Sequence, residues 1–155
     1  MKWTKLMFGR HYRKTLPEVV FRDSDWFFWA YQIGVLEING MQEEAELVSG
    51  RATRIRIPQQ LGEKLVAEYA FCCIGGKFAN VEIVPESRRL HQGSSATIRL
   101  PFFDLSVPRR YGPYDKSGSR KLVASVKLHV FGSRSCHLTK ERCESFFEDD
   151  SNFVF

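Results

Sequence analysis

The stretch that decides the N-terminal part of the fold is LMFGRHYRKTLPEVVFRDSDWFFWAYQIGVL, residues 6–36. We predict a short strand over residues 2–8, followed by a bend at the basic run GRHYRK. The sequence TLPE then follows the capping-box pattern, in which Thr15 accepts from the backbone of Glu18 and the Glu18 side chain reaches back. Proline is tolerated in the first helical turn, because that turn has spare backbone donors. A short helix through Phe21 is therefore expected.

A second helix is indicated directly after the first. Asp23 is a good N-cap, and Gly34 is a plausible end. The apolar positions between them recur with helical spacing: Trp26, Trp29, Ala30 and Ile33. Five aromatic residues in six positions cannot all face one side of a helix. We therefore expect most of them in the core and Phe28 and Tyr31 at an interface, with a protein partner or a second copy in a homodimer.

The remaining sequence changes from helical to strand character near Gly50. Residues 41–49 read as a third helix, and Thr139 as the N-cap of a last helix ending in EDD. Strands are expected in the alternating or apolar runs between these helices. The first run is ATRIRIP (52–58), and KLVAEYAFCC (64–73) and FANVEIVP (78–85) form a pair turned at Gly75-Gly76. Two more runs follow: SSATIRLPFFDLSVP (94–108), bent near Pro101, and RKLVASVKLHVFG (120–132). The predicted class is α+β: an N-terminal strand-bend-helix-helix unit, a mainly antiparallel sheet and a closing C-terminal helix. The two parts are residues 1–50 and 51–155, with one shared core as an alternative.

Charge is distributed unevenly along the 155 residues. The formal net charge is +5, from 23 basic and 18 acidic side chains. Residues 133–155 hold three basic and five acidic side chains, so residues 1–132 carry the other 20 and 13, a net charge of +7. A basic body with an acidic end suits an anionic ligand, and ordinary surface solvation is the alternative.

The sequence also indicates where in the cell the protein is found. No apolar run resembles a signal peptide or reaches the length of a membrane helix. Cys72 and Cys73 are adjacent in a strand-like run, where neighbouring side chains point to opposite faces and do not pair readily. We expect reduced, structural thiols, a cytoplasmic location and no membrane partner.

Residues 8–29, FGRHYRKTLPEVVFRDSDWFFW, resemble the small C-terminal domain of exodeoxyribonuclease X-like proteins, a family that also occurs as stand-alone small proteins, some in phages. The positions that fit its pattern as they stand are Phe8, Gly9, Lys14, Thr15, Leu16, Glu18, Val19, Asp23 and Trp29. Arg10 replaces a lysine, Arg13 stands where the family usually has glycine, and Ser24 where it usually has proline. The resemblance implies an accessory module over residues 1–50 and a nucleic-acid-associated context, with DNA favoured over RNA.

The resemblance does not bring nuclease chemistry with it. That activity belongs to a separate domain with four metal-binding acidic residues, and the DSD at 23–25 begins a helix here instead. A zinc site at Cys136, His137 and Cys143 lacks the usual close cysteine pairs. Pairs such as His91 with Asp104, or His129 with Asp115, are possible acid–base groups, but nothing in the sequence fixes them together. We predict no catalytic residue, no metal and no cofactor, and keep an unrecognised metal-dependent nuclease as the third alternative.

Two basic segments are the candidate nucleic-acid-binding sites. In the bend, cations could bind phosphates and an aromatic ring could stack on a base: Arg10, Tyr12, Arg13 and Lys14. The segment 108–121 reads as a loop with the same combination: Arg109, Arg110, Tyr111, Tyr114 and Lys116. The alternatives are a solvated turn for the first segment and tyrosines packed on the sheet for the second.

The sequence therefore predicts a small non-enzymatic protein that binds nucleic-acid phosphates through basic loops. The alternative is a protein-interaction module, such as a phage-encoded inhibitor or accessory factor of a host nucleic-acid enzyme, that acts through exposed aromatic side chains.

Overall fold

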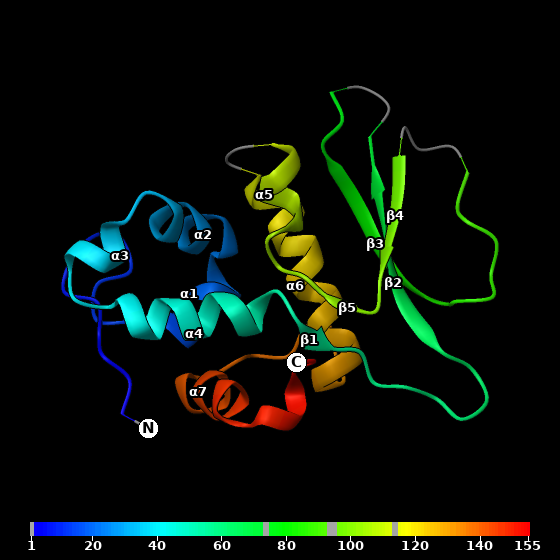
Figure 1. Ribbon diagram of the computed structural model, residues 1–155. Coiled ribbons are helices and arrows are strands. Elements are labelled where there is room, and N and C mark those ends of the chain that lie inside the picture. Colours follow the sequence, from blue (N-terminus) through cyan, green and yellow to red (C-terminus); the bar gives the residue numbers. More distant parts are fainter. Residues whose placement is uncertain (1, 73–74, 93–95, 113–114) are drawn as a thin grey trace.

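The computed structural model describes residues 2–72, 75–92, 96–112 and 115–155, and the α+β class predicted from the sequence is confirmed (Figure 1). The helices are α1 (Leu16–Arg22), α2 (Ser24–Gln32), α3 (Val35–Ile38), α4 (Gln42–Ala52), α5 (Val107–Tyr111), α6 (Lys116–Phe131), α7 (Lys140–Glu148) and the short 3-10 helix η1 (Asp150–Asn152). The strands are β1 (Ile55–Arg56), β2 (Leu65–Phe71), β3 (Phe78–Pro85), β4 (Ala96–Leu100) and β5 (Phe102–Phe103).

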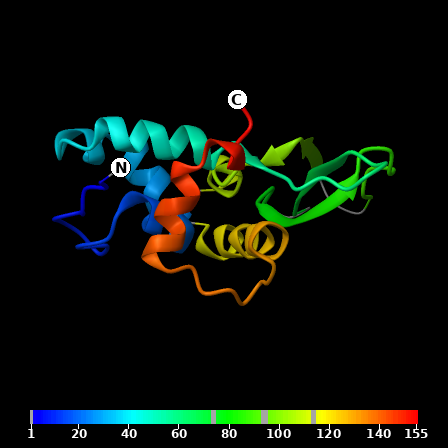
Figure 2. The same ribbon diagram turned by 90° about the horizontal axis from the view of Figure 1, so that it is seen from below.

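Helix α6 lies between a helical part, made of α1–α4 and α7, and the sheet of β2–β4 (Figures 1 and 2). It contacts β3 on one side and α2 on the other. One cluster of buried apolar side chains runs from Trp3 to Phe153, so residues on both sides of Gly50 share a core, and Gly50 itself lies inside α4. Within the described residues, no helix combines the length and the apolar character needed to cross a bilayer.

The three-stranded sheet is antiparallel, in the order β3-β2-β4, and β1 pairs with β5 in a separate ribbon. The predicted β2–β3 hairpin is confirmed, and Gly75 and Gly76 in its turn both adopt positive φ angles of 83° and 67°. Tyr69 of β2 links the three-stranded sheet by hydrogen bonds to β5 and to the residue that follows it. Its buried hydroxyl donates to the Phe102 carbonyl at 3.1 Å and accepts from the Asp104 backbone at 2.9 Å.

The N-terminal strand predicted over residues 2–8 is wrong. This segment is irregular, because its backbone groups bond within the bend and not along a neighbouring strand. Leu6 donates to the Lys14 carbonyl at 2.8 Å, and Arg13 donates to the Leu6 carbonyl at 2.6 Å. Arg13, which stands where the resembled family has glycine, takes a left-handed φ of 70°. Trp3 and Leu6 are buried and anchor the segment to the core.

Both predicted N-terminal helices are confirmed, together with their caps. The Glu18 carboxylate accepts from the Thr15 backbone at 3.1 Å, which forms half of the capping box of α1. Asp23 caps α2 by accepting from the Trp26 backbone at 3.3 Å. Phe28, which we expected at an interface, is buried, because it packs edge-on against Phe27 within the core.

The long strand predicted over residues 120–132 is wrong, and the segment instead forms all of α6 after its first turn. The alternation of Val126, Leu128 and Val130 suggested a strand, but the buried side chains follow helical spacing: Leu122, Val123 and Val126. Asp115 caps the helix by accepting from the Gly118 backbone at 2.9 Å, and Gly132 ends it with a left-handed φ of 94°. The segment 108–121 is accordingly α5 and the first turns of α6 rather than a loop, with residues 113–114 outside the described residues.

The acidic C-terminal segment is docked against the body of the protein. Thr139 caps α7 as predicted, accepting from the Arg142 backbone at 3.2 Å. The Arg51 guanidinium donates to the Phe147 carbonyl at 2.8 Å and to the Asp150 carboxylate at 2.6 Å. Phe153 is fully buried beside Ile55 of β1. The acidic tail is therefore part of the fold and its charges are partly neutralised there.

We expect Tyr69→Phe to lower the free energy of unfolding by about 1–3 kcal/mol, because it leaves the Phe102 carbonyl and the Asp104 backbone amide without their partner in a buried site. Urea unfolding followed by circular dichroism measures this loss. Tyr111→Phe is the matched control, since the Tyr111 side chain is exposed. Equal losses in the two variants would show that the Tyr69 hydroxyl does not stabilise the junction.

Candidate functional site

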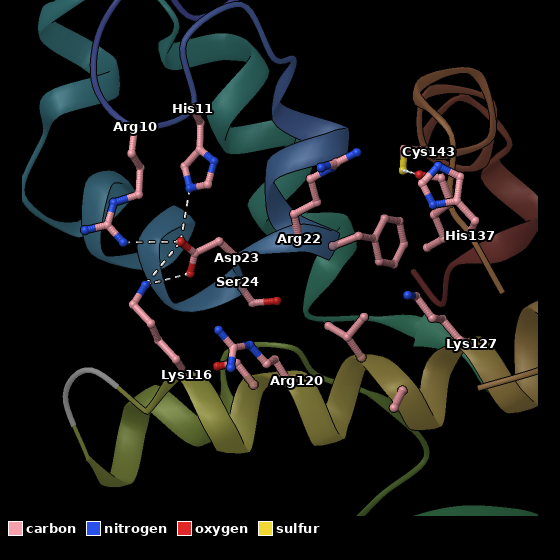
Figure 3. Close-up of a pocket in the computed structure, with 15 residues that line it drawn as sticks. Arg10, His11, Arg22, Asp23, Ser24, Lys116, Arg120, Lys127, His137 and Cys143 are labelled. Atoms are coloured by element: carbon pink, nitrogen blue, oxygen red, sulfur yellow. Dashed lines mark hydrogen bonds and ion pairs between the residues drawn. The ribbon is translucent and has the colours of Figure 1, made fainter. Parts of the chain in front are cut away.

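A groove of about 480 Å³ lies where α6 faces the N-terminal bend and the junction of α1 and α2 (Figure 3). Helix α6 forms one wall, and the bend and the α1–α2 junction form the other. One end is closed by the segment from His137 to Cys143, which leads into α7 and which we call the α7 region. Five Lys and Arg side chains line it: Arg10, Arg22, Lys116, Arg120 and Lys127. Among the described residues that line the groove, Asp23 is the only carboxylate. We call this site the α6 groove.

Asp23 holds one end of the α6 groove together. Its carboxylate accepts from Lys116 Nζ at 3.0 and 3.1 Å and lies 3.0 Å from His11 Nε2 and 3.8 Å from an Arg10 guanidinium nitrogen (Figure 3). Burial acts to raise the pKa of Asp23, but the hydrogen bonds from Lys116, His11 and the Trp26 backbone outweigh it and lower this pKa. The carboxylate therefore stays ionised at neutral pH and fixes the bend to the first turn of α6.

His11 sits beside this carboxylate and against the indole of Trp26, with ring centroids 5.0 Å apart. Burial lowers the pKa of His11, and it outweighs the opposing effect of the hydrogen bond to Asp23. The ring is therefore mostly neutral at pH 7, and the positive charge of the groove comes from its lysine and arginine side chains.

Three cations in the groove have no carboxylate to balance them. The side chains of Arg22, Arg120 and Lys127 make no ion pair or hydrogen bond with any residue that the structure describes. Lys116, Arg120 and Lys127 follow one another at i, i+4 and i+11, which puts them on one face of α6. Like charges that share a concave surface repel one another, so the site favours a ligand with several negative charges.

Apolar side chains lie between the cations and form the floor of the groove. Phe21, Val123 and Leu138 line it and are almost fully buried. Cys143 also lines it, but burial raises the pKa of this thiol to about 12, so it is not a nucleophile at neutral pH. Within the described residues, no group of three or more His, Cys, Asp or Glu side chains could hold a metal ion.

The structure brings together some of the predicted binding residues and separates others. Arg10 of the bend and Lys116 of α6 meet at Asp23 in the groove. Tyr12 and Arg13 lie exposed on the bend, with the guanidinium 5.7 Å from the ring centroid, and Lys14 is half-buried beside them. Arg10 and Lys116, from the two predicted segments, therefore lie in one site, whereas Tyr12, Arg13 and Lys14 are not among the residues that line it.

The two arginines of α5 have structural partners. Arg109 lies 3.2 Å from the Asp25 carboxylate, and Arg110 lies 2.6 Å from that of Asp104. Both carboxylates are buried, and an unpaired buried charge would be strongly destabilising, so the two arginines neutralise the interior. Tyr111 packs its ring 4.2 Å from that of Phe71.

Tyr114 lies outside the described residues. Tyr31 keeps 36% of its surface exposed and stacks on Phe27, with ring planes 3° apart.

Sequence reasoning missed Arg22, Arg120 and Lys127. The signal for the last two was available in the helical spacing of residues 116, 120 and 127, but it was hidden once the segment was read as a loop followed by a strand. Arg22 ends α1 and had no local signal, because only the tertiary fold places it at the edge of this groove. The considered pair His129 and Asp115 is separated by the length of α6, about 21 Å at 1.5 Å per residue, and cannot act together.

No protein-family model, curated protein or solved structure matches this chain. The resemblance of residues 8–29 to the exodeoxyribonuclease X-like domain stays a prediction.

The lowered pKa of His11 predicts that stability falls with acid. The unfolded chain binds a proton at the ordinary histidine pKa near 6.5, whereas the folded chain binds it only at lower pH. Stability is therefore complete above about pH 6.5 and declines as the pH falls below this value. Urea unfolding at pH 7.5 and pH 5 measures the decline, which we expect to be smaller in His11→Gln.

His129→Gln is the companion variant. Burial also lowers the pKa of His129, which lies outside the groove, so this variant measures how much of the loss of stability in acid comes from a histidine elsewhere in the protein. An NMR titration that gave His11 a pKa at or above 6.5 in the folded protein would contradict this account of the groove.

Proposed function

We propose that the protein is a non-enzymatic nucleic-acid-binding protein that holds backbone phosphates in the α6 groove. The observation that carries the proposal is an excess of positive charge in the groove. Five Lys and Arg side chains line it, whereas Asp23 is the only carboxylate among the described residues that do so. Nucleic acids present a row of negative charges, and lysine and arginine side chains bind them with release of counterions. The resemblance of residues 8–29 to a domain of a DNA-processing family supports DNA as the target, in the cytoplasm.

The phosphate contacts proposed here differ from those expected from the sequence. Arg10 and Lys116 remain, and Arg22, Arg120 and Lys127 join them. Arg109 and Arg110 leave the set, because their ion pairs with buried Asp25 and Asp104 stabilise the fold. Arg13 and Lys14 also leave the set, because they do not line the groove, and the remaining contacts share one concave site.

The double variant Arg120→Gln with Lys127→Gln tests the phosphate contacts. We expect DNA affinity to fall by on the order of tenfold or more, since a charged hydrogen bond contributes roughly 1.5–3 kcal/mol before solvent screening reduces it. The slope of log K against log salt should shrink by about 0.7–0.9 for each lost contact. Fluorescence anisotropy with a labelled oligonucleotide at several salt concentrations measures both quantities.

Lys64→Gln is the matched control, because Lys64 precedes β2 and is exposed outside the groove. If the wild-type protein bound no DNA or RNA at low salt, or if the control lowered the slope as much as the groove variants did, the proposed function would be wrong.

Asp23→Asn tests the same site in the opposite direction. Asparagine is as good an N-cap as aspartate, so α2 keeps its first turn, while the groove loses its negative charge. Arg10 and Lys116 then become available to a phosphate, and we expect tighter DNA binding with a salt slope steeper by about one contact.

The same variant should be less stable, because the ion pairs of Asp23 are lost. Isothermal calorimetry and urea unfolding measure the two effects on one sample. Unchanged or weaker binding in a variant that remains folded would count against phosphate binding at this end of the groove.

A further inference from the structure

We infer that the α6 groove takes a single strand and not a duplex; this inference rests on the proposed function and specifies its ligand. It follows from the juxtaposition of Arg10 and Arg22 on one wall with Lys116, Arg120 and Lys127 on the other (Figure 3). A ligand that uses both sets of cations must lie between the walls, so the size of the groove selects the form of nucleic acid.

The groove is too small for two strands. Its volume of about 480 Å³ falls within the range of roughly 300–1,000 Å³ that is usual for pockets enclosing small ligands. Such a space holds a nucleotide-sized part of one chain. A duplex would have to rest on the rim, outside the space between the two walls.

Helix α6 also cannot act as a recognition helix for duplex DNA. A helix that reads the major groove must project from the protein. The basic face of α6 is recessed between the bend and the α7 region, and the helix is also packed against β3 and α2. The cations of α6 are therefore positioned to bind a ligand that enters the groove of the protein. They are not positioned for α6 to insert into the major groove of a duplex.

The arrangement of charge along α6 suits an extended chain of phosphates. Lys116 and Lys127 are eleven residues apart in sequence, which corresponds to about 16 Å along a helix. One strand of B-form DNA carries a charge every 3.4 Å or so of axis, and the spacing grows when the strand is extended. An extended single strand that passes through the groove can therefore meet more than one cation of this face.

The floor of the groove is closed by side chains of the core. Phe21, Val123 and Leu138 line it but are only 5–7% exposed, so bases cannot stack on them. A strand in the groove is therefore held through its phosphates. A positively charged groove that follows the backbone is one of the features of proteins that bind single strands without sequence preference.

The test compares a labelled 12-nucleotide single strand with its duplex, by fluorescence anisotropy with the full chain at two salt concentrations. We expect the single strand to bind at least tenfold more tightly. Inorganic phosphate and a nucleoside monophosphate serve as competitors and should displace it only at far higher concentrations than an unlabelled 12-mer. A single strand of RNA shows whether the sugar matters.

Ala124→Phe tests the role of the groove without changing any charge. Ala124 lines the groove on α6 and is only half-buried, so the larger side chain should fill the space and weaken single-strand binding at least tenfold. Circular dichroism checks folding. If this variant does not fold, the Arg120→Gln and Lys127→Gln pair replaces it and should weaken single-strand binding more than duplex binding.

The outcomes separate the two proposals. Equal or tighter duplex binding, with a normal salt slope, would overturn the single-strand inference and leave the proposed function standing. Competition by the monophosphate as effective as that of the 12-mer would also overturn it, by showing a small-molecule pocket. Binding to neither form would overturn the proposed function itself.

Discussion

The Asp23 carboxylate is the contact on which the arrangement of the site depends. It caps α2, and it also holds Lys116 at the start of α6 and His11 and Arg10 in the N-terminal bend. Hydrogen bonds from Lys116, His11 and the Trp26 backbone outweigh burial and lower the pKa of Asp23, so its charge persists at neutral pH. The bend and the first turn of α6 therefore meet at this carboxylate, at one end of the α6 groove.

The basic residues of the chain fall into two groups with different physical roles. Arg99, Arg109 and Arg110 pair with three buried carboxylates: Glu68, Asp25 and Asp104. Removal of a carboxylate from water costs several kcal/mol unless a cation compensates it, so these arginines support the fold. Arg22, Arg120 and Lys127 compensate no described carboxylate and gather in one groove. Net charge alone could not separate the two groups, because the difference lies in which carboxylates the fold buries.

Local signals explain what could be predicted from the sequence. The capping box at Thr15, the cap at Asp23 and the turn at Gly75-Gly76 depend on residues only a few positions apart, and all three are present. Helix α6 was missed because its interior is rich in valine, which is a weak helix former, and its apolar positions also alternate. The sequence does contain a helix cap at Asp115 and a helix end at Gly132. Packing of α6 against β3 and α2 stabilises the helix and outweighs the preference of its valines for a strand. The groove itself could not be predicted, because its two walls come from segments that are far apart in the sequence.

The most direct test of the account is to observe the side chains of the groove while a single-stranded oligonucleotide is added. NMR spectra of the arginine and lysine side-chain nitrogen groups report each cation separately. We expect the signals of Arg22, Arg120 and Lys127 to shift together and saturably. The signals of Arg99 and Arg109, which pair with buried carboxylates, should change little. Shifts confined to the exposed face of the β2–β4 sheet, or no saturable shift in the groove, would contradict the account.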